Sequence, residues 1–156
     1  MAMKLYLVRH GHAGSRDWSR HDQYRQLSDR GRDEAAEIEL ALAEINVGAV
    51  ISSPATRCVQ TVEPLSKRLG LEVIEDKRLW EDADIADAMD VLNENTEDGA
   101  VICSHGNIIP EMLHWLLQTG MTAKGRGCAK GSVWTVTYRN GQFTKARYHQ
   151  LGHLPR

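Results

Sequence analysis

Three polar clusters in the chain carry residue types that bind phosphate. They are Arg9-His10-Gly11-His12, the run SPATR at 53–57, which contains Arg57, and Ser104-His105-Gly106. Arginine offers phosphoryl oxygens a rigid fork of donors. The glycine after His10 and the glycine after His105 let the backbone turn sharply and leave the imidazole faces uncovered. Two arginines and two histidines brought together would form a strongly positive pocket, and the natural occupant of such a pocket is phosphate.

Each cluster directly follows a segment that predicts a buried strand. Residues 4–8, 48–52 and 99–103 are short apolar runs rich in β-branched side chains, as in parallel core strands. Ligands of open α/β sheets bind outside the carboxyl ends of the strands. We therefore expect the three clusters to meet at one edge of a sheet. A helix that opens at Ser53-Pro54 would add unpaired backbone NH groups there.

Helical patterns alternate with these strands. An apolar stripe through 28–45 begins at a potential cap, Ser28, and a second stripe begins at Pro54 and stops at Gly70. Two further helices are predicted at 84–94 and 110–118. This alternation predicts an α/β fold, a three-layer sandwich whose mostly parallel central sheet is flanked by helices.

The remaining strands complete the predicted sheet. Residues 71–74 indicate a short strand, and 133–139 and 142–148 alternate around Asn140-Gly141, a strong hairpin signal. The sheet is therefore expected to end in a C-terminal antiparallel hairpin.

The composition fits one globular domain over residues 1–156. Hydrophobic residues make up 42% of the chain and charged residues 26%, and the formal net charge is −2. That charge gives no overall attraction to nucleic acid or to anionic membranes, so anion binding must come from a local cluster. No apolar run is long enough for a signal peptide or a membrane span, so we expect a cytoplasmic protein.

The three cysteines predict neither a disulfide framework nor a zinc site. Cys58, Cys103 and Cys128 are odd in number and lack CxxC spacing, which is typical of reduced, buried thiols.

The other histidine patterns are weaker signals. His10 and His12 form an HxH pair, but no carboxylate motif accompanies it, so no metal site is predicted and His12 is placed at the pocket rim. The pair His21-Asp22 lacks the helical partners of an HD metal motif and is interpreted as a surface feature.

Two polar loops could extend the pocket. Residues 14–16, which include Arg16, and Arg25 could contact the phosphate or the rest of a substrate. The loop 120–132 combines four glycines with Lys124, Arg126 and Lys130. It could close over an anionic substrate, but we interpret it as a mobile, solvated loop.

Taken together, these motifs resemble the histidine phosphatase superfamily, also called the phosphoglycerate mutase-like family. The matches are VRHGHA at 8–13, LSDRG at 27–31, ISSPATRCVQT at 51–61 and CSHG at 103–106, in the family's order. The small size and lack of inserts are similar to the compact branch that includes phosphohistidine phosphatases. The run VICSHGNIIPEML at 101–113 also resembles the histidine-phosphatase domains fused to Nudix hydrolases.

The resemblance implies a metal-independent phosphatase, a phosphoric monoester hydrolase that needs no cofactor. It would hydrolyse a phosphomonoester or a phosphoramidate through a phosphohistidine intermediate on His10. Arg9, Arg57 and a protonated His105 would clamp the phosphoryl oxygens. The phosphate- and substrate-binding residues implied are Arg9, Gly11, Arg16, Arg57, His105 and Gly106.

The proton donor to the leaving group is the open assignment. Glu81 in RLWED is the best positional match to the family's acid, with Asp82 and Asp84 as rivals. The fuller acid motif of the family is missing here. Phosphohistidine phosphatases of the compact branch can lack this carboxylate, because a phosphoramidate expels its leaving group more easily.

Two other functions remain as alternatives. One is a non-catalytic or weakly catalytic module of the same fold that binds a phospho-ligand or a phosphoprotein. The other, a sugar-acid mutase, is disfavoured because the chain lacks the extra length that family mutases use to hold substrate. Expected partners are a phosphorylated small molecule or a phosphoprotein, and neither nucleic acid nor a membrane; the sequence makes no prediction of oligomeric state.

Overall fold

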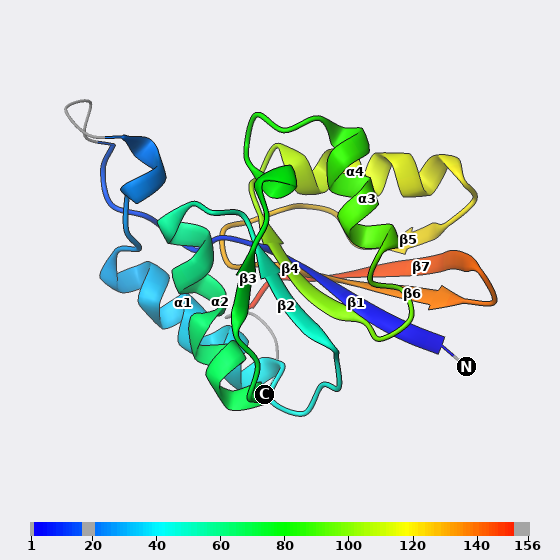
Figure 1. The fold of residues 1–156 in the computed structure, drawn as a ribbon, viewed down its shortest axis with the longest axis horizontal. Coiled ribbons are helices and arrows are strands. Elements are labelled where there is room, and N and C mark those ends of the chain that lie inside the picture. Colours follow the sequence, from blue (N-terminus) through cyan, green and yellow to red (C-terminus); the bar gives the residue numbers. More distant parts are fainter. Residues whose placement is uncertain (1, 17–20, 152–156) are drawn as a thin grey trace.

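The computed structural model describes residues 2–16 and 21–151 of the chain. Within these residues the centre of the molecule is a seven-stranded sheet with the order β3-β2-β4-β1-β6-β7-β5 (Figure 1). The strands β1 to β4 run parallel, β6 is antiparallel to both β1 and β7, and β5 is parallel to β7. The bounds of the strands are Ala2–Arg9 (β1), Ala49–Ser52 (β2), Val73–Glu75 (β3), Ala100–Ser104 (β4), Thr122–Lys124 (β5), Val133–Arg139 (β6) and Gln142–His149 (β7).

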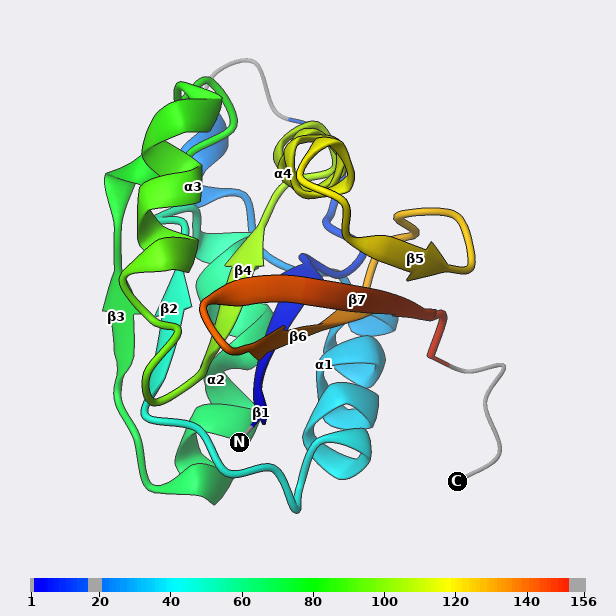
Figure 2. The ribbon, with the colours of Figure 1, turned by 90° about the vertical axis from the view of Figure 1, so that its right-hand side faces the viewer.

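Helices cover both faces of this sheet. Helices α1 and α2 lie against one face, and α3 and α4 lie against the other (Figure 2). The bounds are Asp29–Ala41 (α1), Thr56–Leu69 (α2), Ile85–Asn93 (α3) and Ile108–Gln118 (α4), with 3-10 turns at Asp22–Tyr24 (η1) and Lys77–Leu79 (η2). The predicted three-layer α/β sandwich is therefore confirmed. None of the helices in the described residues is long and apolar enough to cross a membrane.

The central strand β1 divides the hydrophobic core into two halves. Because successive strand residues point to opposite faces, Leu5 and Leu7 pack with α3 and α4, whereas Tyr6 and Val8 pack with α1 and α2. Burial on both faces explains why this strand is a continuous apolar run rather than an alternating one.

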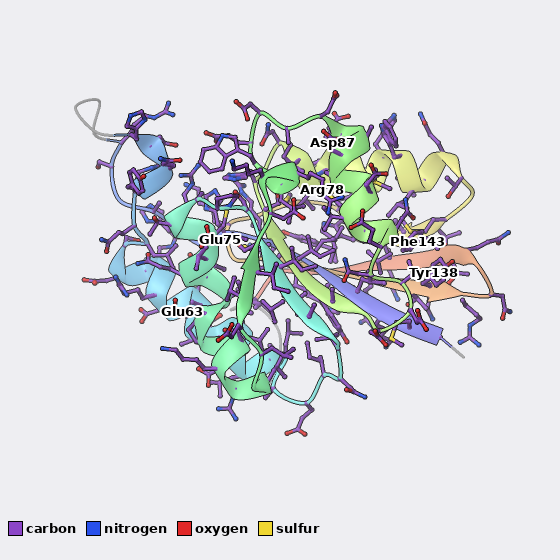
Figure 3. All side chains as sticks on the ribbon, in the orientation of Figure 1. Glu63, Glu75, Arg78, Asp87, Tyr138 and Phe143 are labelled. Atoms are coloured by element: carbon purple, nitrogen blue, oxygen red, sulfur yellow. The ribbon has the colours of Figure 1, made fainter. Side chains whose placement is uncertain are left out.

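Several boundaries follow the sequence signals. The Ser28 side chain accepts a hydrogen bond from the Gly31 amide and caps α1, and α2 ends at Gly70 with a left-handed φ of 72°. Asn140 and Gly141 have φ values of 53° and 81°, as a two-residue hairpin turn of type I′ requires. Across this hairpin Tyr138 and Phe143 pack edge to face with their ring centroids 4.9 Å apart (Figure 3).

Other boundaries differ from the expectation. Helix α2 starts at Thr56 rather than at Pro54, because the amide of Ser53 still pairs with the carbonyl of Cys103 and two residues are then needed to turn. Helix α4 starts at Ile108, two residues before Pro110, and β3 is shifted to Val73–Glu75.

The segment 120–132 is exposed over residues 122–127, as its composition indicated, but it is not a loop throughout. Residues 122–124 form β5 and pair in parallel with residues 145–147 of β7. Further along, the amide of Gly131 donates to the carbonyls of Arg9 and His10, and the Arg9 amide donates to the carbonyl of Ser132. The segment is therefore hydrogen-bonded to β7 and, through Gly131 and Ser132, to the carboxyl end of β1.

A close approach between α1 and the loop after β1 generates a stability prediction. An added Cβ at Gly31 would collide with the carbonyl oxygen of His12. Gly31→Ala should therefore lower the free energy of unfolding by about 1–3 kcal/mol, as overpacking does. That loss would override the gain of about 1 kcal/mol that alanine normally brings to a helix. Urea unfolding would measure the change.

The matched control is Gly14→Ala, because the nearest heavy atom to the added Cβ would lie 3.9 Å away. Its effect should stay within about 0.5 kcal/mol. An equal or greater stability of Gly31→Ala would show that the loop gives way without cost.

Candidate active site

The three predicted clusters meet at the carboxyl edge of the parallel strands. Strand β4 lies between β1 and β2, so the residues that follow these three strands are neighbours. The amide of His10 donates to the carbonyl of Ser104 over 3.1 Å, and the Ser53 amide donates to the carbonyl of Cys103 over 3.0 Å. As a result the rings of His10 and His105 stand edge to face, with centroids 5.5 Å apart.

The His10 ring is held in one tautomer. Its Nδ1 lies 2.8 Å from the carbonyl oxygen of Gly11, and a carbonyl only accepts, so Nδ1 carries the proton and donates it. The second nitrogen, Nε2, then carries the free lone pair. A neutral imidazole fixed in this way is the form that can attack an electrophile.

The surroundings of His10 also favour the neutral ring. Burial is the largest cause that lowers the pKa of His10, to about 3, and the positive charges of Arg57, His105 and Arg9 act in the same direction. The hydrogen bond to Gly11 opposes the shift without cancelling it.

Arg57 is a buried cation held by carboxylates from two loops. Its side chain is 1% exposed and projects from the first turn of α2. Its Nη2 lies 3.3 Å from Asp22 Oδ2 and 3.3 Å from Glu81 Oε2, while Nη1 donates to the Asp22 carbonyl over 3.0 Å. Its Nε is buried and has no hydrogen-bond partner among the described residues.

The orientation of His105 is set by Ser53. Nε2 of His105 lies 2.8 Å from Ser53 Oγ, so this nitrogen is already engaged. Its Nδ1 lies 3.5 Å from Arg57 Nη2 and 3.9 Å from Glu81 Oε2, on the side of the site. Trp80 packs edge-on against the ring with centroids 5.7 Å apart. Nδ1 is therefore the nitrogen that can meet a ligand.

Arg9 is fixed over a glycine. Its Nη1 donates to the carbonyl of Cys128 over 2.7 Å, and a Cβ at Gly106 would lie 2.6 Å from the Arg9 Nε atom. Gly106 thus leaves room for the guanidinium beside His105. Like Arg57, Arg9 retains a buried Nε without a hydrogen-bond partner among the described residues.

Glu81 is the predicted acid that the structure places in the site. Just before it, Arg78 forms ion pairs with Asp76 at 2.8 Å and with Glu94 at 2.7 Å, which ties η2 to the end of α3 (Figure 3). The side chain of Asn107 donates to the Glu81 carbonyl over 2.6 Å and so fixes the next turn of chain.

The two rivals of Glu81 lie elsewhere. Asp82 is exposed and lines a separate cavity with Pro54 and Trp80, and Asp84 stands at the N-cap of α3. Of the three carboxylates only that of Glu81 makes an ion pair with Arg57.

Two predicted binding residues lie in different settings. The amide of Gly11 donates to Thr61 Oγ1 over 2.9 Å, and its carbonyl accepts from His10, so Gly11 orients the imidazole. Arg16 is largely exposed and pairs with Asp22 Oδ1 at 3.2 Å, so it is linked to the pocket through that carboxylate.

Asp22 is the site residue that the sequence reading missed. The expectation that His21-Asp22 is a surface feature is wrong for Asp22, whose carboxylate joins Arg16, Arg25 and Arg57. Burial alone would raise the pKa of Asp22, but these guanidinium groups hold it below its ordinary value. No local pattern marks this aspartate, because its main partner lies 35 residues away.

His12 is bound into the neighbouring loop. Its Nδ1 lies 2.6 Å from Ser28 Oγ and its amide donates to Glu34 Oε1 over 2.7 Å. Among the described residues no group of three or more His, Cys, Asp and Glu side chains is arranged to hold a metal ion.

Comparison with protein-family models identifies the family. The family described as the histidine phosphatase superfamily (branch 1) matches residues 5–89. An 8-oxo-(d)GTP phosphatase of Mycolicibacterium smegmatis is 30% identical over 151 residues, which cover 92% of this chain and 47% of that protein. The chain thus spans about half the length of this curated relative.

Solved structures share the fold. The protein histidine phosphatase SixA complexed with tungstate is 21% identical over 95% of both chains, with a TM-score of 0.73. A mycobacterial glucosyl-3-phosphoglycerate phosphatase is 18% identical over 97% of this chain and 98% of that chain, with a TM-score of 0.69.

The His10 environment generates a prediction about its titration. An ordinary imidazole takes up a proton below a pKa of 6.5, whereas the lowered pKa of His10, about 3, keeps the ring neutral as the pH falls from 6.5 to 4. Two-bond ¹⁵N–¹H NMR spectra should show His10 as the Nδ1-H tautomer throughout this range. A His10 midpoint between pH 6 and 7, or an Nε2-H tautomer, would contradict the assignment.

Proposed function

The chain belongs to the histidine phosphatase superfamily, and from this premise we propose that it hydrolyses a phosphorylated substrate through a phosphohistidine intermediate on His10. The observation that carries the proposal is the fixed, neutral imidazole of His10. Its Nδ1 proton is donated to the Gly11 carbonyl, so Nε2 is free to act, and the ring lies near the side chains of Arg9, Arg57 and His105. A nucleophile surrounded by anion-binding groups suits phosphoryl transfer.

In the first step Nε2 of His10 attacks phosphorus, and the bond from phosphorus to the leaving oxygen or nitrogen breaks. Charge on the equatorial oxygens is stabilised by the guanidinium groups of Arg9 and Arg57. His105 contributes through Nδ1, because Ser53 already holds Nε2. The catalytic residues of this step are therefore His10, Arg9, Arg57 and His105.

Glu81 supplies the leaving group with its proton. Its carboxylate lies on Arg57 at 3.3 Å, and a phosphoryl group bound to that guanidinium would compete for the same donor. The displaced Glu81 carboxylate, which is 37% exposed, then takes up a proton from the bound phosphate monoanion or from solvent and passes it to the leaving atom. In the second step the same carboxylate takes a proton from water as the water attacks the phosphohistidine.

The second step also benefits from the low basicity of His10. The environment that lowers the pKa of the ring to about 3 makes the imidazole a weaker base and hence a better leaving group from phosphorus. The neutral ring returns to its starting state with Nδ1 still bound to Gly11. Neither step requires a metal ion or a cofactor.

The substrate is a phosphomonoester or a phosphoramidate. The structural neighbour SixA is named for protein phosphohistidine, and the Mycolicibacterium smegmatis relative is named for 8-oxo-(d)GTP. A phosphorylated small molecule such as a nucleotide and a phosphoprotein are therefore the partners that we propose to test first.

The intermediate generates the first prediction. Rapid acid-free quenching during turnover of a ³²P-labelled phosphoramidate should trap an acid-labile, base-stable label on the protein, with EDTA present throughout. His10→Ala should abolish the label and the activity while circular dichroism shows the same fold. His114→Ala, a change on an exposed face of α4, should retain both. Tight binding of phosphate without any label would indicate the phospho-ligand-binding module instead.

The acid generates the second prediction. Glu81→Gln should lower kcat about 100-fold or more on an alkyl phosphate, whose poor leaving group needs the proton. The loss should be less than about tenfold on a nitrophenyl phosphate or a phosphoramidate, because these leaving groups need less help. Asp82→Asn is the matched control and should leave both rates unchanged. An equal loss on all substrates would assign Glu81 to the positioning of Arg57 rather than to proton transfer.

A further inference from the structure

A second group of cations lies on the sheet, away from the candidate active site. In register across the strands, Lys4 of β1 is opposite Thr137 of β6, which is opposite Lys145 of β7. Two residues along, Thr135 of β6 is opposite Arg147 of β7, and Arg147 is opposite Lys124 of β5. Because residues two apart share a face, these side chains all point to the side of the sheet that carries α1.

This face is hollowed rather than flat. A cavity of about 670 Å³ lies over it, and its walls include Leu42, Ile45 and Leu151. The ends of β7 and β5 extend past α1, which leaves this part of the sheet without a helix over it (Figure 2). We call this hollow the basic cavity. None of its lining residues belongs to the group around His10.

The positive charge of the basic cavity is uncompensated. Its lining includes Lys4, Lys124, Lys145 and Arg147 but no Asp or Glu, and none of these four cations forms an ion pair in the described residues. The pKa of His149, which also lines the cavity, is lowered by burial and then by the charges of Arg147 and Lys4.

One pair of these cations costs stability in the free protein. Lys124 and Arg147 are direct cross-strand partners, and like charges in such positions are destabilising. The chain as a whole has a net charge of −2, so this accumulation is local and does not follow from a basic composition. An anionic ligand would relieve the repulsion, and the binding of that ligand would account for the arrangement.

We propose that the basic cavity is a second binding site, which takes a small molecule carrying two or more phosphoryl groups. Its volume of about 670 Å³ falls within the range of small-molecule pockets. The cations extend from β1 to β5, three strand spacings or about 14 Å, so one phosphate cannot reach all of them. Threonine hydroxyls between the cations supply further donors.

The lining disfavours a nucleic acid as the occupant. Single-stranded nucleic acids bind by stacking bases on exposed aromatic rings as well as through charge. The one aromatic side chain of the cavity wall other than His149 is Tyr6, which is 9% exposed. The cavity thus offers charge and hydroxyl groups but no stacking platform.

The experiment is an NMR titration of the ¹⁵N-labelled protein with inorganic tripolyphosphate at low salt. We expect two separately saturating sets of amide shifts, one around His10 and one in β5 and β7 around Lys124, Lys145 and Arg147. The second set should need at least tenfold more ligand in Lys145→Gln/Arg147→Gln. Turnover of nitrophenyl phosphate by this variant should be unchanged, which separates the basic cavity from the proposed catalytic function.

The matched control is Lys67→Gln/Arg68→Gln, which removes two cations from α2, and it should bind tripolyphosphate like the unchanged protein. If the cavity variant does not fold, the titration of the unchanged protein decides alone. Shifts confined to the surroundings of His10 would overturn the proposal. Tighter binding of oligo-dT or of a polyglutamate peptide than of tripolyphosphate at β5 and β7 would also overturn it.

Discussion

The buried guanidinium of Arg57 is the charge on which the site depends. Removing a cation from water costs several kcal/mol unless anions and hydrogen-bond acceptors replace the solvent. Here the replacements come from Asp22 in η1 and Glu81 after η2, segments that lie on opposite sides of α2 in the chain. The guanidinium therefore draws two loops of unrelated sequence over the carboxyl ends of the strands. If one of the two carboxylates were removed, the buried charge of Arg57 would be only partly compensated.

The same charge organises the ionisation of the pocket. It helps to lower the pKa of His10, whose neutral form is favoured, and it counteracts the effect of burial on the pKa of Asp22, whose ionised form is favoured. The one cation of Arg57 thus favours the neutral form of His10 and the ionised form of Asp22. Its Nη1 and Nη2 are engaged by the protein, whereas its buried Nε has no hydrogen-bond partner among the described residues.

The sequence predicted the parts of the site that follow directly from strand periodicity. Arg9, His10 and His105 follow apolar runs, and parallel strands necessarily deliver such residues to one edge. Asp22 was missed because it lies in a polar stretch without periodicity, and only the folded chain brings it to Arg57. The predicted start of α2 was two residues too early because Ser53 still pairs with β4 in line with β2. The preference of a Ser-Pro pair for helix starts gives no sign of this pairing.

The glycine-rich segment 120–132 shows a different limit of local patterns. The three residues of β5 are too few to show the alternation of apolar and polar side chains that marks a strand. This strand therefore could not be predicted from its own sequence, because it forms by pairing with β7. The sequence also did not indicate that the carbonyl of Cys128 and the amide of Gly131 in this segment bind the end of β1. Every residue has a backbone amide and carbonyl, so the amino-acid sequence does not show which of these groups will hold Arg9 in place.

Strand β1 connects the candidate active site with the proposed basic cavity. Its carboxyl end carries Arg9 and His10 beside the parallel strands, and its amino end carries Lys4 beside the antiparallel strands. The neighbours of β1 run in different directions. The parallel strand β4 ends beside the carboxyl end of β1, so the loops after the two strands meet there. The antiparallel hairpin of β6 and β7 instead lies alongside the amino end of β1. A strand end gathers a compact group of donors around one phosphoryl group, while a hairpin face spreads cations over several strands. The two proposed anion sites therefore differ in form because the sheet is mixed: one lies at the ends of parallel strands and the other on the face of an antiparallel hairpin.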